Sequence, residues 1–158
     1  MTPAEPTPWA YVDTSTLVKR YVREEGSLRA RALLRRLRVL SSALLPIETL
    51  AALRRRRNTG DLSERDFAGI LADVQRDRQR WELVELTQQV LARAEELLHA
   101  EGLRTLDALH IASALELERA LGEKLPFLTS DVRQRTAAQR AGLQVVWVGA
   151  APSSCSRA

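Results

Sequence analysis

The chain has 158 residues, of which 45% are hydrophobic, so it is long and apolar enough for a globular domain and is not intrinsically disordered. Its net charge of +4 comes from basic residues that are nearly all arginine, which is only a modest indication of a phosphate-bearing partner because genome base composition produces the same bias. The lone cysteine, Cys155, excludes an internal disulfide and a cysteine-based metal site. The chain has no long apolar run, and residues 1–8 do not resemble a signal peptide, so we expect a cytoplasmic protein without a membrane anchor.

The first predicted element is a buried strand from Trp9 to Val12, because this run is short, apolar, aromatic and β-branched. Asp13, Thr14 and Ser15 follow it, and residues of these types favour turns and helix N-termini. A helix comes next, with apolar residues at one-face spacing: Leu17, Val18 and Tyr21. An acid and two hydroxyls therefore stand where a strand gives way to a helix, and open α/β sheets bind their ligands at that end of their strands.

Strands and helices continue to alternate along the rest of the chain. The further strands are predicted over 39–43, 81–86, 125–129 and 143–148, and the further helices over 27–37, 44–58, 63–80, 87–100, 103–121 and 131–141. Ser27 is expected to cap the second helix, whose predicted buried stripe consists of Leu28, Ala32, Leu33 and Leu37. We expect the two helices within 63–100 to form a cap at one edge of the sheet.

This alternation predicts an α/β fold with three layers, in which a parallel sheet has helices on both faces. No repeat or linker divides the chain, so residues 1–150 are predicted to form a single domain. Residues 151–158 are small and polar, and we expect them to form a flexible C-terminal tail.

Four carboxylates stand out against this pattern: Asp13, Glu48, Asp107 and Asp131. Each also has a purely structural interpretation. Asp13 and Asp131 are good helix caps, Glu48 fits a half-exposed helix position beside an arginine, and Asp107 is within reach of Arg104. Asp107 is the sharpest case, because its neighbours at helical spacing are Leu103, His110, Ile111 and Ala114. A charge on such a face is costly unless it is paired or bound to a metal.

The joint placement of these acids favours a shared site. Asp13, Glu48 and Asp131 follow the first, second and fourth predicted strands, and the carboxyl ends of parallel strands lie at one edge of a sheet. Asp107 lies on the helix that leads into the fourth strand. Converging carboxylates repel one another, and a hard divalent cation such as Mg²⁺ or Mn²⁺ relieves that repulsion. A metal held by carboxylates can activate water against a phosphodiester, and nearby hydroxyls can hold waters or phosphate oxygens: Thr14, Ser15, Thr129 and Ser130.

These residues lie in segments that resemble those of the PIN-domain family, and in particular the VapC-type toxin ribonucleases of bacterial toxin–antitoxin pairs. The matching segments are Tyr11 to Tyr21, Pro46 to Glu48, Thr105 to Ala112 and Phe127 to Asp131, followed by Ala137-Ala138 and Gly142 to Val145. The resemblance implies a five-stranded parallel sheet of order 3-2-1-4-5. It also implies an Mg²⁺- or Mn²⁺-dependent endoribonuclease that leaves a 5′-phosphate and a 3′-hydroxyl, forms a homodimer and is silenced by an antitoxin.

The family's acids map onto Asp13, Glu48, Asp107 and Asp131, and its hydroxyls map onto Ser15 and Thr129. Asp13 and Asp107 are interpreted as the metal ligands, and Glu48 as a ligand or as the group that orients the attacking water. The match at Asp131 is the loosest, because the fourth acid varies among such domains.

Two features keep alternatives open. His110 is either a core histidine or a catalytic one, and the basic run Arg54 to Arg57 is either a solvated helix end or a contact for RNA or antitoxin. The alternative to an enzyme is a PIN-like module that binds RNA or protein without cutting. A haloacid dehalogenase-type phosphatase is disfavoured because Ser15 stands where its second acid belongs, and a response-regulator receiver is disfavoured because no lysine follows the fifth strand.

Overall fold

The computed structural model describes residues 7–150, and the predicted tail over 151–158 lies outside them, as does Cys155. The strands are β1 (Trp9–Val12), β2 (Arg38–Ser42), β3 (Glu82–Val84), β4 (Pro126–Thr129) and β5 (Gln144–Trp147). The helices are α1 (Thr14–Tyr21), α2 (Ser27–Leu34), α3 (Leu45–Asn58), α4 (Glu64–Arg78), α5 (Gln88–Glu101), α6 (Thr105–Leu121) and α7 (Val132–Arg140). Every predicted element is therefore present in the predicted order.

The five strands form one parallel sheet in the order β3-β2-β1-β4-β5, as the resemblance implied. Strand β1 is central: Tyr11 lies beside Leu40 of β2 on one side and Phe127 of β4 on the other. The chain reverses its direction of winding at β1, so the crevice beyond β1 and β4 is the topological switch point where α/β sheets bind ligands.

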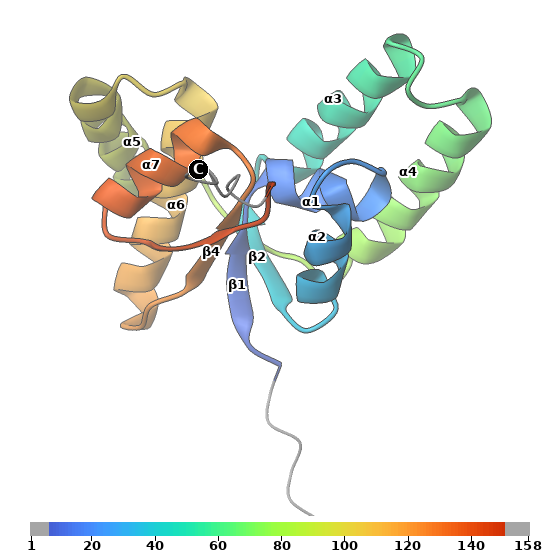
Figure 1. Ribbon diagram of the computed structural model, residues 1–158. Helices are drawn as coiled ribbons and strands as arrows, with labels where there is room; N and C mark the ends of the chain where they lie inside the picture. Colours follow the sequence, from blue (N-terminus) through green and yellow to red (C-terminus); the bar gives the residue numbers. More distant parts are fainter. Residues whose placement is uncertain (1–6, 151–158) are drawn as a thin grey trace, which may run out of the picture.

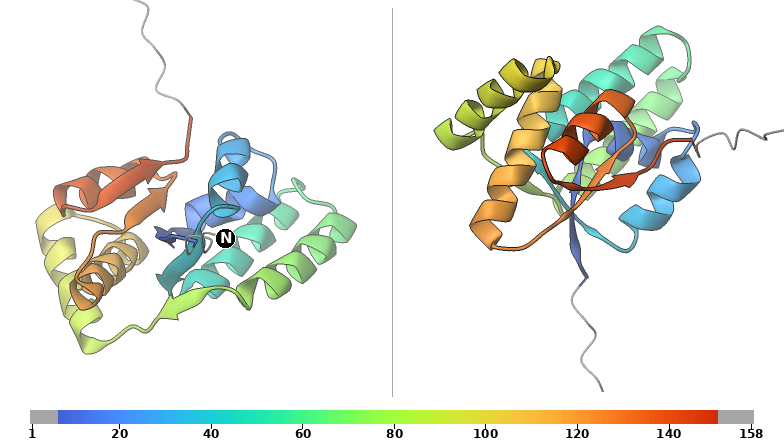
Figure 2. Two further views of the ribbon diagram at one scale, coloured as in Figure 1. Left: turned by 90° about the horizontal axis from the view of Figure 1, so that it is seen from below. Right: turned by 60° about the vertical axis from the view of Figure 1, so that its left-hand side comes forward.

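Helices cover both faces of the sheet, which makes a three-layer α/β/α domain (Figures 1 and 2). The alternation along β1 separates the two hydrophobic cores, because Ala10 and Val12 pack with α1, α2, α3 and α4, whereas Tyr11 packs with α5, α6 and α7. Ala10, Tyr11 and Val12 of the central strand are fully buried, which fixes the register of the strand and thereby the position of the Asp13 turn that follows it.

The predicted cap formed by the two helices of 63–100 is wrong. Helix α4 contributes Phe67 and Val74 to the core on one face, and α5 contributes Val90 and Leu97 to the core on the other. Figure 1 shows the two helices on opposite sides of the sheet. The two helices thus belong to opposite layers, because the short strand β3 between them carries the chain across the sheet edge.

The predicted buried stripe of the second helix is wrong in part. Leu28 is 84% exposed and Ala32 is exposed too, whereas Leu33 and Leu37 are half-buried and pack against the core. The fully buried residues of this helix are Ser27, Ala30 and Leu34. The helix begins after Gly26, whose φ of 84° lies in the left-handed region, so Ser27 is its first residue and not its cap. The Ser27 hydroxyl instead donates to the Val22 carbonyl and closes the preceding turn.

Among residues 7–150 no helix combines the length and the apolar character that crossing a bilayer requires.

Candidate active site

The turn after β1 presents Asp13 at the carboxyl edge of the sheet. Asp13 is the N-cap of α1, and its Oδ2 accepts hydrogen bonds from the Ser15 amide at 2.9 Å and the Ser15 hydroxyl at 2.5 Å. Its Oδ1 accepts one from the Gln134 side-chain amide at 2.9 Å. Asp13 is 5% exposed, so this carboxylate is buried but fully engaged with donors. It both caps a helix and faces the candidate site.

Glu48 reaches the same edge from α3. Pro46 lies in the first turn of that helix, where its missing N–H is not needed. The Glu48 Oε2 accepts a hydrogen bond from the Thr14 hydroxyl at 3.1 Å and lies 2.6 Å from His110 Nε2. Glu48 is thus held between the start of α1 and the middle of α6.

His110 is a buried residue that also contacts the site. Its Nε2 faces Glu48, and its Nδ1 lies 3.0 Å from the Tyr11 hydroxyl. Burial opposes the charged imidazolium, but the hydrogen bond with Glu48 and the negative charges of Asp13, Glu48 and Asp107 outweigh it, so the pKa of His110 is raised. His110 is therefore a core histidine, and its Nε2 also contacts an acid at the edge of the candidate site. A catalytic role for His110 stays a prediction.

Asp107 lies in the first turn of α6 and faces the other acids. Burial, followed by the charges of Asp131 and Asp13, raises the pKa of Asp107 to about 6, against the opposing effects of Arg104 and His110. Its Oδ1 lies 3.5 Å from the Gln134 amide nitrogen, and its buried Oδ2 has no hydrogen-bond partner among the described residues. A half-buried carboxylate with an orphaned oxygen is unusual and requires an explanation.

Asp131 and Thr129 complete the edge beyond β4. Asp131 caps α7, and its Oδ1 accepts from the backbone amides of Arg133 at 2.8 Å and Gln134 at 3.2 Å. The Thr129 hydroxyl lies 3.4 Å from that of Ser15 and accepts from the Asp131 amide at 3.1 Å. These contacts hold the turns after β1 and β4 side by side along the cleft.

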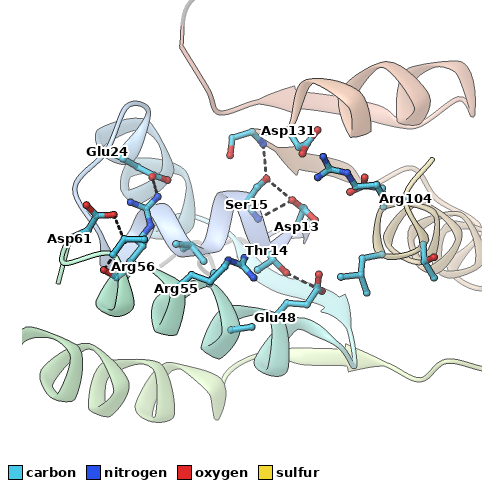
Figure 3. Close-up of a pocket in the computed structure, with 18 residues that line it drawn as sticks. Asp13, Thr14, Ser15, Glu24, Glu48, Arg55, Arg56, Asp61, Arg104 and Asp131 are labelled. Carbon is cyan, nitrogen blue, oxygen red and sulfur yellow. Dashed lines mark hydrogen bonds and ion pairs between the residues drawn. The ribbon is translucent and has the colours of Figure 1, made fainter. Parts of the chain in front are cut away.

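All four candidate acids and Ser15 line a single cleft with a volume of about 740 Å³ (Figure 3). Thr129 is fully buried behind this lining, and its hydroxyl contacts the hydroxyl of the lining residue Ser15. The structure therefore brings together every site residue that the sequence suggested. Arg55 and Arg104 reach the cleft from opposite sides, with Asp13 between them (Figure 3).

Sequence reasoning missed the contribution of Gln134 and left the partner of His110 open. Gln134 is 1% exposed and contacts both Asp13 and Asp107, yet it is separated from them by 121 and 27 positions along the chain. A glutamine within a polar helix carries no local signal of burial, so only the packing of α7 against the sheet reveals it.

The donor set is compatible with a hard divalent cation. Carboxylate oxygens are the ligands that Mg²⁺ and Mn²⁺ prefer, and the orphaned Oδ2 of Asp107 is an oxygen with no other partner among residues 7–150. No group of three or more His, Cys, Asp or Glu side chains within that range is already arranged to hold a metal ion. Because Mg²⁺ is commonly bound through one or two carboxylates and several waters, Asp13 and Asp107 would suffice.

Comparisons with known proteins agree with this geometry. Residues 10–140 match the family model described as PIN domain. The chain is 39% identical over 147 residues to Ribonuclease VapC45 of Mycobacterium tuberculosis (strain CDC 1551 / Oshkosh), which covers 87% of this chain and 94% of that protein. It is 36% identical over 137 residues to Ribonuclease VapC46 of Mycobacterium tuberculosis (strain ATCC 25618 / H37Rv), with 86% and 95% covered.

Two solved structures share the fold. A toxin–antitoxin complex from Klebsiella pneumoniae aligns with a TM-score of 0.59 at 17% identity, covering 87% of this chain and 95% of that chain. VapBC-5 from Mycobacterium tuberculosis, a member of the VapBC family of toxin–antitoxin systems, aligns with a TM-score of 0.52 at 22% identity, covering 92% and 100%. The family-model match and the identity to the curated relatives, together with the 3-2-1-4-5 sheet, show that this chain belongs to the PIN-domain family and, within it, to the VapC proteins.

Proposed function

We propose that this chain is an Mg²⁺- or Mn²⁺-dependent endoribonuclease and the toxin of a toxin–antitoxin pair. The observation that carries the proposal is the gathering of Asp13, Glu48, Asp107 and Asp131 around one cleft that arginines flank. The names of the relatives as VapC ribonucleases support the substrate class. A binding module for a polyanion would gain nothing from four acids, so their presence favours catalysis over binding alone.

Asp13 and Asp107 are the residues that would hold the cation. When bound, the cation would supply a Lewis acid that lowers the pKa of a coordinated water and offsets the charge that develops on the phosphodiester. Glu48 lines the same cleft as both acids, and its Oε1, which accepts no hydrogen bond from residues 7–150, can hold and orient a water. Thr14 and His110 restrain the Glu48 carboxylate, and a restrained group loses less freedom on reaching the reactive geometry.

The arginines of the cleft are suited to the RNA backbone. Within residues 7–150, Arg56 pairs with Glu24 and Arg57 pairs with Glu64, whereas no carboxylate lies within ion-pair distance of Arg55 or Arg104. The latter two guanidinium groups are therefore available for phosphates on either side of the scissile bond. Of the basic run at the end of α3, Arg55 is the member that the proposal assigns to RNA.

The proposal includes two protein partners, a cognate antitoxin and a second copy of this chain. Support for the antitoxin comes from the solved structures of the same fold, one of which is described as a toxin–antitoxin complex and the other as a member of a family of toxin–antitoxin systems. The second copy is proposed from the family resemblance. Large apolar side chains are also exposed on the helices that carry or are capped by the acids: Ile47, Leu50, Leu106 and Val132. The cytoplasm, where RNA and antitoxin are both available, is the proposed location.

A cleavage assay tests the enzymatic part of the proposal. Purified protein, free of antitoxin, is incubated with a mixed single-stranded and structured RNA pool in Mn²⁺, in Mg²⁺ or in EDTA. The proposal predicts cleavage with either cation, none in EDTA, none with Asp13→Asn, and products that carry a 5′-phosphate. Binding of RNA without cleavage in any cation would instead establish the non-catalytic module, and cleavage by Asp13→Asn would identify a contaminating nuclease.

A further inference from the structure

Gln134 places a buried amide between the two acids that the proposed function assigns to the cation. The side chain is 1% exposed, and its Nε2 donates to Asp13 Oδ1 at 2.9 Å. The same nitrogen lies 3.5 Å from Asp107 Oδ1. One amide group thus contacts both the turn at the end of β1 and the first turn of α6, the helix that precedes β4.

The orientation of this amide follows from its neighbours. Both facing atoms are carboxylate oxygens, which accept hydrogen bonds when ionised, so the nitrogen and its two hydrogens must face them. The Gln134 carbonyl oxygen is then directed away from the acids, and it is buried without a hydrogen-bond partner among the described residues. An unmade hydrogen bond at a buried carbonyl reduces the stability of the fold.

A methionine or leucine would fill this volume without burying an unpartnered carbonyl. The amide is therefore a poor solution for packing and a good one for holding two carboxylates at a set separation. Asp131 supports the same arrangement, because its Oδ1 accepts from the Gln134 backbone amide and so fixes the turn of α7 from which the side chain extends.

We propose that Gln134 is a positioning residue that sets the separation of Asp13 and Asp107 so that both can bind one divalent cation. This inference rests on the proposed function. Gln134 itself touches neither the cation nor RNA; it acts through the two carboxylates. The same proposal gives Asp131 two roles: it holds the backbone from which the Gln134 side chain extends, and it adds negative charge to the cleft.

The test compares wild-type protein with Gln134→Met, Gln134→Asn and the control Gln139→Met. Methionine matches the length of glutamine but cannot donate, asparagine can donate but is one methylene too short, and Gln139 is an exposed glutamine on the same helix. Three quantities are measured: the Mn²⁺ dissociation constant by isothermal titration calorimetry, the melting temperature in EDTA, and kcat and KM for RNA cleavage at a limiting Mn²⁺ concentration.

We expect Gln134→Met and Gln134→Asn to weaken Mn²⁺ binding by about tenfold, the lower end of the effect of residues that orient metal ligands. The melting temperature of Gln134→Met in EDTA should stay within about 3 °C of the wild-type value, because the loss of two donors is offset by removal of the unpartnered carbonyl. At limiting Mn²⁺ kcat should fall while KM for RNA is unchanged, and Gln139→Met should match the wild type throughout.

Wild-type Mn²⁺ affinity in both Gln134 variants, whatever their melting temperatures, would overturn the inference and leave the nuclease proposal intact. A wild-type protein that neither binds Mn²⁺ nor cuts RNA would overturn both. Gln134→Asn keeps the test decisive if Gln134→Met does not fold, since its amide preserves the polar character of the site.

Discussion

His110 Nε2 lies 2.6 Å from Glu48 Oε2, and the opposite nitrogen of the same ring lies 3.0 Å from the Tyr11 hydroxyl. A single buried imidazole therefore links the central strand of the sheet to an acid of the cleft. Because its pKa is raised by this hydrogen bond and by the surrounding carboxylates, the ring carries a positive charge over a wider pH range than a free histidine. The charged ring offsets part of the repulsion among the acids.

His110→Phe tests this link by removing both hydrogen bonds while keeping a ring in the core. We expect kcat to fall by about 10- to 100-fold, as it does when groups that orient active-site carboxylates are removed, with KM for RNA unchanged. The matched control is Tyr11→Phe, which removes the other hydrogen bond of the ring and leaves Glu48 restrained. An equal loss of kcat in the two variants would show that core packing, and not the contact with Glu48, is responsible.

Asp107→Ala should abolish RNA cleavage without destabilising the metal-free protein. The substitution removes a carboxylate that is disfavoured by burial and by the charges of Asp131 and Asp13, together with its unpartnered Oδ2. Thermal unfolding in EDTA is the measurement, and the expected melting temperature equals or exceeds that of the wild type. A large fall in melting temperature would mean that Asp107 stabilises the fold through a partner that the structure does not show.

The metal-free protein should lose stability as the pH rises. The pKa of Asp107 is raised from 3.8 to about 6 in the folded state, so the folded protein binds more protons than the unfolded chain between these values. The stabilisation is complete below about pH 4 and is lost as the pH rises through about 6. Because Asp107 is only half-buried and solvent screens its charge, the stabilisation amounts to less than about 3 kcal/mol. The raised pKa of His110 has the same effect at higher pH. The charged imidazolium stabilises the folded protein, and this stabilisation is lost as the pH rises through the pKa of His110 in the folded state.

Melting temperatures in EDTA from pH 5 to pH 8 check this dependence. In Asp107→Asn the melting temperature should no longer fall with pH below about pH 6.5. The fall at higher pH, which comes from His110, should remain. Saturating Mn²⁺ should flatten the wild-type profile, because a bound cation favours ionised carboxylates. A melting temperature that rises with pH in EDTA would contradict the raised pKa of Asp107.

Arg55 and Arg104 should contribute to RNA binding through phosphates and not through bases. Replacing either with glutamine should raise KM and reduce the slope of log affinity against log salt by about 0.7, the value for one phosphate contact on a single strand. The control is Arg54→Gln, because the Arg54 guanidinium lies over the Phe67 ring, 6.0 Å from its centroid, and does not line the cleft. An unchanged salt slope in both cleft variants would exclude them as phosphate contacts.

The fold was predictable from sequence because its signals are local. The apolar run of β1, the caps at Asp13, Ser63, Thr87 and Asp131, and the glycines after helices each act within a few residues, and the structure contains the corresponding elements. The face of α2 was only partly predictable, since Leu28 is the more apolar residue and yet is exposed, whereas the small Ala30 is fully buried. Helices α4 and α5 were wrongly predicted to share one edge of the sheet. The layer to which each helix belongs depends on tertiary packing, which the local sequence does not show.

The acids of the site were predictable because each follows a strand or interrupts an apolar face. Their supporting residues were not, since Gln134 and His110 act over long sequence separations and have ordinary helical neighbours. The pattern of charges thus predicts which acids gather at the cleft, and the tertiary structure alone shows which residues hold them in place.

Diffraction from crystals soaked in Mn²⁺ and recorded at the manganese absorption edge tests the central claim most directly. The account predicts one strong anomalous peak in the cleft, within about 2.3 Å of carboxylate oxygens of Asp13 and Asp107, and its loss in Asp107→Ala. A peak elsewhere, or no peak from a protein that still cuts RNA in EDTA, would contradict the account.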